Sequence, residues 1–144
     1  MIKEKDTMTH TLKIKKITQI THDVKSYQLE KPADYSFVPG QATEVSIQKE
    51  GWTEEKRPFT FTSLPEDDFL EFIIKSYPDH NGVTEQMDQL EEGDQLIIDD
   101  PWGAIQSKGP GVFIAGGAGV TPFIAIFRDL HQKRSPLRKF ADFF

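Results

Sequence analysis

Cysteine is absent from the 144 residues of this chain. The chain can therefore form no disulfide, no thiolate zinc site and no cysteine-ligated iron–sulfur cluster, so any redox chemistry would need a bound organic cofactor. Apolar runs that approach the ~20 residues needed to span a bilayer are also missing. Residues 1–7 mix charges of both signs with no apolar stretch after them, unlike a signal peptide or a membrane anchor. We expect a soluble, cytoplasmic protein without a membrane partner.

An excess of positive charge is missing as well. The formal net charge is −6, which argues against a general nucleic-acid binder, because such proteins depend on a basic surface. The contents of hydrophobic (37%) and charged (28%) residues are ordinary and do not distinguish an enzyme from a binding module. The histidines have no metal-ligand spacing, so we expect surface positions for them and no metal site. They are His10, His22, His80 and His131.

Short segments of alternating polar and apolar residues, separated by turn residues, occupy most of the chain before residue 100. This spacing is typical of an all-β barrel or sandwich. Between the last two strands, Val83, Met87 and Leu90 recur at helical spacing and predict a short amphipathic helix, with Gly93 placed to end it. The expected strands are residues 11–15, continuing to Ile20 after a bulge at Lys16, then 24–29, 43–47, 57–63, 70–75 and 94–99.

The pattern changes after a linker at residues 108–111. Residues 112–115 are fully apolar and predict a strand, residues 116–119 predict a glycine turn, and residues 121–131 predict a helix. Strand, glycine turn and helix make the first half of an α/β nucleotide-binding unit, and the ~30 residues beyond the linker are too few for a complete one. We therefore expect a flexible arm (1–8), a barrel domain (9–108) and a truncated nucleotide-binding domain (109–144).

Residues 57–63 combine a cation, two aromatic rings and hydroxyl groups on one predicted strand. Because strand side chains alternate between faces, Phe59 and Phe61 are expected to project to one side and the threonines to the other. Pro58 lacks an N–H and suits a strand start or edge, where a ligand could lie against unpaired backbone. Arg57 could hold a phosphate by two parallel hydrogen bonds. An ordinary barrel strand with a surface arginine explains the stretch about equally well.

Two further stretches suit phosphate groups. At the start of the short helix, Gly82 and Thr84 could present free N–H groups to an anion, although an ordinary helix capped by Thr84 is the simpler interpretation. Residues 116–122 hold three glycines in four positions before a Thr-Pro helix start, which leaves room for a diphosphate against bare backbone. A glycine-rich turn without a ligand is the alternative there.

In this order and spacing, the three stretches resemble the ferredoxin–NADP⁺ reductase superfamily over roughly residues 9–131. Residues 57–60 match its flavin motif, Arg-x-Tyr/Phe-Ser/Thr. Residues 81–84 match its Gly-x-x-Ser/Thr phosphate motif, with Asn81 in place of the first glycine. Residues 116–122 match its nicotinamide-nucleotide motif, Gly-Gly-x-Gly-x-Thr-Pro, in full. The resemblance implies a mainly β fold: a six-stranded antiparallel Greek-key flavin-binding barrel with one short helix, followed by the first strand and helix of an incomplete α/β nucleotide-binding domain.

The resemblance also implies roles for individual residues. Arg57 would grip the flavin diphosphate, Phe59 would lie on the isoalloxazine ring, and Thr60 would hydrogen-bond near the flavin N5 atom as the catalytic residue. The implied cofactor-binding residues are Arg57, Pro58, Phe59, Thr60, Ile73, Ile74, Lys75, Asn81, Gly82, Val83, Thr84, Gly117, Gly119 and Thr121.

By the same resemblance, such a protein takes hydride from NADPH or NADH onto FAD and passes single electrons to an acceptor such as flavodoxin or ferredoxin. FAD is favoured over FMN because two separated phosphate-binding features suit a diphosphate. Two alternatives stay open from the sequence. One is a flavin-binding module without turnover, because the nucleotide domain is incomplete, and the other is a barrel that binds nothing and serves in assembly.

Overall fold

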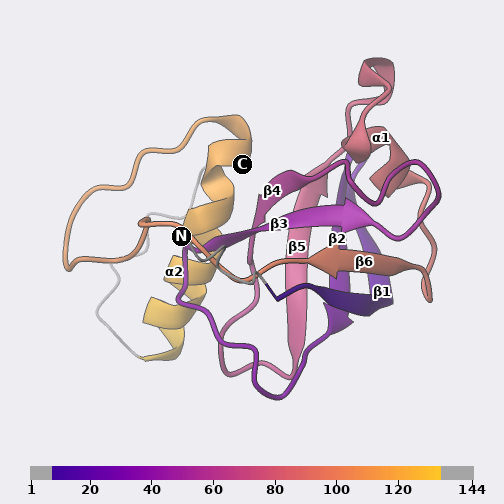
Figure 1. Cartoon of the computed structure of the whole chain (residues 1–144). Coiled ribbons are helices and arrows are strands. Elements are labelled where there is room, and N and C mark those ends of the chain that lie inside the picture. Colours follow the sequence, from indigo (N-terminus) through magenta and orange to yellow (C-terminus); the bar gives the residue numbers. More distant parts are fainter. Residues whose placement is uncertain (1–7, 134–144) are drawn as a thin grey trace, which may run out of the picture.

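The computed structural model describes residues 8–133. Most of the expected arm (1–8), and the part of the predicted nucleotide-binding domain after Lys133, therefore lie outside the described residues. Six antiparallel strands form one sheet in the order β4-β3-β6-β1-β2-β5 (Figure 1). The strands are β1 (His10–Thr21), β2 (Val24–Glu30), β3 (Ala42–Ile47), β4 (Arg57–Thr60), β5 (Phe69–Lys75) and β6 (Gln95–Ile98). The helices are η1 (Pro78–His80), α1 (Val83–Asp88), η2 (Gly117–Val120) and α2 (Thr121–Gln132).

The sheet closes on itself where its two edge strands meet. Just beyond β4, the Thr62 N–H donates to the Glu71 carbonyl of β5 at 2.9 Å, and the Glu71 N–H donates to the Ser63 hydroxyl at 2.9 Å. These bonds join the first and last strands of the order, so the expected six-stranded barrel is confirmed. The predicted bulge in β1 is confirmed too, since the pairing with β2 shifts register between Ile14 and Lys16.

The barrel interior is filled by alternate residues of the strands, as the period of a half-buried strand requires. On β5 the inward side chains Leu70, Phe72 and Ile74 are buried. Phe61 is fully buried, stacks on Phe37 with ring centroids 4.4 Å apart and packs against Phe72 at 5.1 Å. Burying each such ring contributes about 1.5–3 kcal/mol.

The apolar face of helix α1 packs onto the barrel core. Val83, Met87 and Leu90 are buried, as their spacing predicted, and the Tyr27 hydroxyl donates to the Met87 carbonyl at 2.8 Å. The helix ends at Asp88 rather than near Gly93. Gly93, with φ 96°, belongs to the next turn, where its N–H donates to the Ile14 carbonyl.

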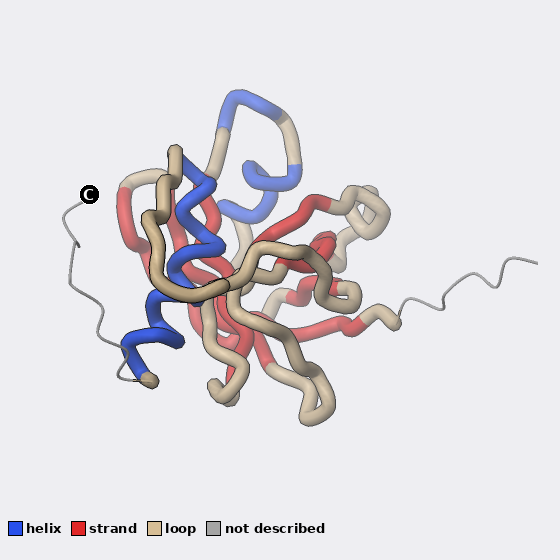
Figure 2. Tube along the Cα trace, turned by 90° about the vertical axis from the view of Figure 1, so that its left-hand side faces the viewer, coloured by secondary structure: helices blue, strands red, loops and turns tan. Residues whose placement is uncertain are grey.

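The predicted strand at residues 112–115 is wrong. These residues form part of a long loop that swings away from the barrel and passes on the outer side of α2 (Figures 1 and 2). Val112 and Ile114 are 90% and 88% exposed, while Phe113 packs on Phe123 and Phe127 of α2. A strand requires a neighbouring strand for its backbone hydrogen bonds, and no strand of residues 8–133 pairs with this stretch.

The following helix forms as expected and lies beside the barrel (Figure 2). Its Ala125 and Ile126 are buried. Gly40, in the turn before β3, lets the chain come this close: its φ is 102°, and a Cβ there would lie 2.2 Å from the Ile105 carbonyl oxygen and 3.2 Å from Ile126 Cδ1. The glycine therefore allows the β6–α2 loop and α2 to settle onto the barrel.

Substitution of Gly40 by alanine should destabilise the protein through both strain and collision. We expect a loss of about 3 kcal/mol or more in the free energy of unfolding, measured by denaturant titration. Gly51→Ala is the matched control, because Gly51 also has a positive φ of 83° but a Cβ at that position would meet no atom within 4 Å. The control should lose only about 1 kcal/mol. Equal losses in the two variants would contradict the close approach at Gly40.

Candidate functional site

A groove on the barrel surface brings together segments that are far apart in the sequence. It consists of two adjoining pockets of about 370 and 200 Å³, which share Pro58, Phe59, Tyr77 and Thr84. Its walls come from β4, from the end of β5, from the η1–α1 segment and from the start of α2. We call this surface the β4–β5 groove.

Most of the predicted cofactor-binding residues line this groove. The first pocket takes in Arg57, Gly82 and Val83, and the second takes in Thr60, Ile73, Ile74, Lys75 and Thr121, in addition to the shared residues. Three predicted residues do not line either pocket: Asn81, Gly117 and Gly119. Three lining residues were missed: Tyr77, His80 and Ala118. The groove thus joins all three sequence motifs, although not through every residue named from them.

The β4 wall offers a cation at one end and a ring in the middle. The Arg57 side chain is 49% exposed. Its Nη1 donates to the Lys56 carbonyl at 2.7 Å and lies 3.8 Å from Glu55 Oε2, which leaves most of the guanidinium donors facing solvent. Phe59 is half-buried and packs on Phe72 at 6.3 Å, so its ring is held in place by the core.

Only the first part of residues 57–63 forms a ligand wall. Phe59 and Phe61 both pack on Phe72, but Phe61 is fully buried in the core and lines neither pocket. Thr62 is also buried, and its hydroxyl donates to the Glu71 side chain at 2.8 Å. Just beyond β4 the chain bonds to β5 and closes the barrel, and this long-range contact leaves no signal in the local alternation.

Thr84 does not cap helix α1. The N-cap residue is Gly82, with extended backbone (φ −117°, ψ −172°) and no side-chain capping hydrogen bond. Thr84 instead contributes to both pockets. The simpler interpretation, a capping threonine, is therefore not supported.

Asn81 stands where this motif usually has its first glycine, and it adopts a left-handed backbone conformation that glycine readily allows. Its φ is 45°, the only positive value among non-glycine residues in the described range 8–133. Asparagine tolerates this left-handed conformation better than most residues. Asn81 therefore shapes the turn into α1 without lining the groove.

Tyr77 and His80 add a flat aromatic edge that the sequence motifs did not indicate. Their rings stack nearly parallel, 5° apart, with centroids 5.3 Å from each other, and Lys75 Nζ lies 5.5 Å from the centroid of the Tyr77 ring. Tyr77 lies between β5 and η1, His80 is the last residue of η1, and both line the first pocket. Two aromatic residues around Pro78, just before the phosphate motif, were the available signal.

The glycine motif reaches the groove through its non-glycine residues. Gly117 has φ 55° and starts η2, which runs into α2. The Thr121 hydroxyl donates to the Ala118 carbonyl at 2.9 Å, and these two residues line the second pocket. A Cβ added at Gly117 or Gly119 would meet no atom within 4 Å. The backbone of this turn is therefore open to close approach by a ligand.

Strand β5 also carries a buried carboxylate that lines neither pocket. Glu71 is buried on β5, and its side chain accepts hydrogen bonds from the hydroxyls of Thr62 and Ser26 and from Arg128 Nη1 of α2, at 2.8, 3.0 and 2.7 Å. Burial alone would raise the pKa of Glu71. The hydrogen bonds from Arg128, Thr62 and Ser26 and the Arg128 charge outweigh burial and hold that pKa below the ordinary glutamate range.

The structure offers no sign of a metal centre or a membrane span within the residues that it describes. Residues 8–133 contain no cluster of three or more histidine, aspartate or glutamate side chains able to hold a metal ion. None of the helices in that range is long and apolar enough to cross a membrane.

Comparison with known families decides what kind of barrel this is. The profile of a family described as the oxidoreductase FAD-binding domain matches residues 11–107. The chain belongs to this family. The expected FAD-binding barrel is thereby confirmed, and the match takes in all six strands of the sheet except His10, the first residue of β1. Of the residues that line the groove, only Ala118 and Thr121 lie beyond the matched segment.

Several relatives of this FAD-binding domain are reductase components of oxygenase systems. The reductase component of propane 2-monooxygenase from Rhodococcus jostii is 32% identical over 127 residues, covering 83% of this chain and 34% of the relative. The naphthalene 1,2-dioxygenase system ferredoxin–NAD(P)⁺ reductase component from Pseudomonas putida is 26% identical over 130 residues, covering 84% and 38%. The chain thus spans about a third of the length of these curated relatives.

Solved structures share the fold. The ferredoxin reductase in carbazole 1,9a-dioxygenase superposes with a TM-score of 0.75 at 23% identity, covering 88% of this chain and 40% of that one. A ferredoxin NADP⁺ reductase from Neisseria gonorrhoeae, solved with bound FAD and NADP, gives 0.68 at 20% identity, covering 86% and 53%. The resemblance to ferredoxin–NADP⁺ reductases is confirmed at the level of fold.

Glu71 should make the FAD-binding domain sensitive to acid. Because its pKa is lowered in the folded state, its contribution to stability is complete above the ordinary glutamate pKa of about 4.3 and is lost as the pH falls below it. Glu71→Gln keeps an acceptor for Arg128 and Thr62 but cannot titrate, so its unfolding free energy should fall less steeply than that of the wild type between about pH 6 and about pH 3.

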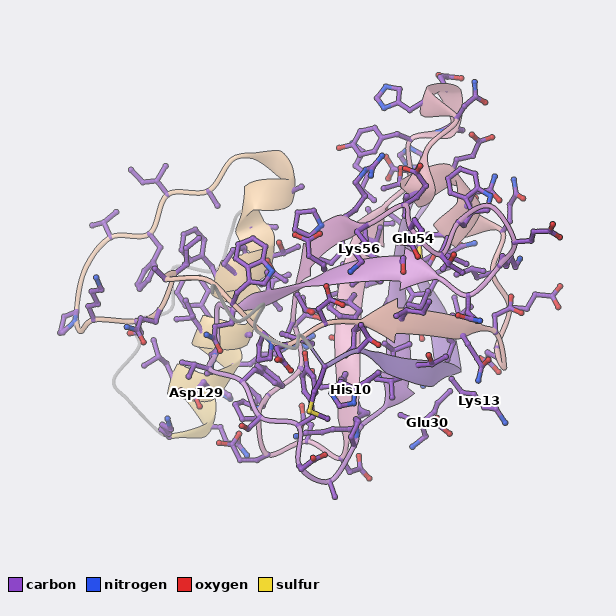
Figure 3. The ribbon with its side chains drawn as sticks, in the orientation of Figure 1. His10, Lys13, Glu30, Glu54, Lys56 and Asp129 are labelled. Atoms are coloured by element: carbon purple, nitrogen blue, oxygen red, sulfur yellow. The ribbon has the colours of Figure 1, made fainter. Side chains whose placement is uncertain are left out.

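The comparison is made by denaturant unfolding at each pH. Glu54→Gln, at an exposed position in the β3–β4 loop (Figure 3), should keep the wild-type slope. Parallel curves for the wild type and Glu71→Gln would show that the buried carboxylate is not stabilised as described.

Proposed function

We propose that the β4–β5 groove holds FAD and that this chain forms the flavin-binding part of an NAD(P)H-dependent reductase. The reductase would deliver single electrons to an acceptor protein such as ferredoxin or flavodoxin. The observation that carries the proposal is convergence: motifs from residues 57–60, 81–84 and 116–122, separated along the chain, contribute to one groove. A barrel that binds nothing gives no reason for these three to meet.

The groove suits the two halves of a flavin dinucleotide. The first pocket has the exposed guanidinium of Arg57 together with the backbone of Gly82 and the hydroxyl-bearing Thr84, a combination that can hold a diphosphate. A Cβ added at Gly82 would meet only the His80 carbonyl oxygen, at 3.7 Å, so a phosphate can approach the backbone there. This two-part arrangement favours FAD over FMN.

The second pocket suits the flavin ring. Phe59 offers an apolar surface that is fixed by its packing on Phe72, and residues 73–75 of β5 form another wall. Thr60 ends β4 inside this pocket, so we propose that its hydroxyl hydrogen-bonds near flavin N5 as the catalytic residue. Bound flavin supplies the conversion between hydride chemistry and one-electron transfer. The residues of the chain bind and orient the ring.

The glycine motif supports a place for the nicotinamide nucleotide. Ala118 and Thr121 line the second pocket together with Thr60 and Ile73. We propose that residues 9–108 form the FAD domain and that residues 109–144 contribute to the NAD(P)-binding domain, with Gly117 and Gly119 leaving the backbone open to a phosphate. NADPH or NADH would be the donor, and the cytoplasm the place of action.

A flavin-binding module without turnover is the second candidate. It is favoured by residues 112–115, which pair with no strand within the described part of the chain, so the sheet of a nucleotide domain is not built there. Both candidates bind FAD. They differ in whether a nicotinamide nucleotide reduces it.

Arg57 should be needed for FAD but not for folding. Arg57→Ala removes a half-exposed cation, and we expect FAD affinity to fall about tenfold or more, equivalent to ~1.4 kcal/mol. Flavin fluorescence titration measures the affinity. Lys16→Ala removes an exposed cation from β1 and should leave FAD affinity unchanged. An unchanged affinity in Arg57→Ala would place the diphosphate elsewhere.

Anaerobic mixing of the FAD-loaded chain with NADPH, and separately with NADH, distinguishes the two candidates. Bleaching of the oxidised flavin spectrum is expected if the chain is a reductase, because hydride transfer requires the reacting atoms to come within ~3–3.5 Å. Dithionite reduction of the same sample is the control for a reducible flavin. An oxidised spectrum that persists with both nucleotides would favour the module, and a chain that retains no flavin would defeat both.

A further inference from the structure

Helix α2 meets the barrel at two levels. Near its start, Ala118 and Thr121 line the second pocket together with Ile73 and Lys75 of β5. Two turns later, Arg128 Nη1 donates to the Glu71 side chain of the same strand and to the Thr62 carbonyl, both at 2.7 Å. Figure 1 shows α2 lying beside the barrel.

The two levels lie on the same two elements. Seven residues of α-helix separate Thr121 from Arg128 and span ~10.5 Å. Glu71, Ile73 and Lys75 lie on one face of β5, and Ile73 and Lys75 are ~7 and ~13 Å along the strand from Glu71. Because one helix carries both contacts, fixing its Arg128 end constrains where Ala118 and Thr121 lie.

The Arg128 contact is specific enough to set this register. Glu71 is buried, with 8% of its side chain exposed. The apolar contacts of the buried Ala125 and Ile126 are not directional, unlike a bond to this carboxylate. The Glu71 carboxylate is itself oriented by the Thr62 and Ser26 hydroxyls, at 2.8 and 3.0 Å. A charge-assisted bond to such an oriented carboxylate is strongly directional.

We propose that Arg128 is a positioning residue: its bond to Glu71 fixes α2 along β5 and so holds Ala118 and Thr121 against the flavin-ring half of the groove. This inference rests on the proposed FAD site, but the Arg128–Glu71 bond, which we call the latch, involves only residues of the chain. The diphosphate half, lined by Arg57 and Gly82–Thr84, contains no residue of α2 and is independent of the latch.

The test uses Arg128→Met in the full chain, with three readouts. FAD affinity should fall about tenfold. The affinity for ADP, which probes the diphosphate half by displacing FAD, should stay within about twofold. Amide hydrogen exchange in peptides covering residues 117–124 should become faster, while exchange in β1 and β2 stays unchanged.

Two further variants distinguish the loss of the Arg128–Glu71 bond from a general loss of stability. The double variant Glu71→Gln with Arg128→Met leaves no buried charge unpaired, and it should show the same loss of FAD affinity and the same faster exchange. Lys133→Met is the matched control, because Lys133 pairs along the same helix, with Asp129 (Figure 3) at 2.9 Å, and it should behave as wild type.

Each outcome either supports the latch or overturns it. If both Arg128 variants keep wild-type FAD affinity and wild-type exchange at residues 117–124, α2 is held by its apolar packing alone and the inference is wrong. Equal losses for FAD and ADP would indicate a general structural role and would also overturn it. If the wild type binds no FAD, the proposed function fails, and the exchange experiment still judges the latch.

Discussion

The closure of the sheet beyond β4 is the constraint on which the rest of the structure depends. A backbone bond from the Thr62 N–H to the Glu71 carbonyl, with a bond from the Glu71 N–H to the Ser63 hydroxyl, joins the edge strands, which otherwise lie at opposite ends of the strand order. Closure removes two exposed edges, each a liability in an open sheet. It also places β4 next to β5, and the groove exists only because the ends of these two strands lie close together.

Glu71 ties this closure to helix α2. Its backbone takes part in closing the barrel, and its side chain accepts bonds from within the barrel and from Arg128. A buried carboxylate without partners would be costly, and a paired one is tolerable mainly where it fixes a geometry. Here the Glu71 side chain joins the barrel, through Thr62 and Ser26, to helix α2, through Arg128.

Much of this fold could be predicted from local pattern. Strand alternation predicted β1 to β6 because each strand buries one face, and the buried set Val83, Met87 and Leu90 followed from helical spacing. The groove could be anticipated only through motifs in the right order, since no local pattern states that Thr60 and Ile73 are neighbours. Tyr77 and Ala118 line the groove because the tertiary fold places them there, so the defining residues of the motifs do not identify them.

The failed prediction at residues 112–115 has the same physical origin. An apolar run predicts a strand because buried parallel strands are apolar on both faces, but a strand exists only where a neighbour completes its hydrogen bonds. In residues 8–133 that neighbour is missing, and Val112 and Ile114 are left in solvent, while Phe113 alone reaches α2. Helix α2 nevertheless forms and is seated by Ile126 and Arg128, both of which contact the barrel side. Because no strand of residues 8–133 pairs with residues 112–115, the position of α2 is set by its contacts with the barrel rather than by a sheet of its own.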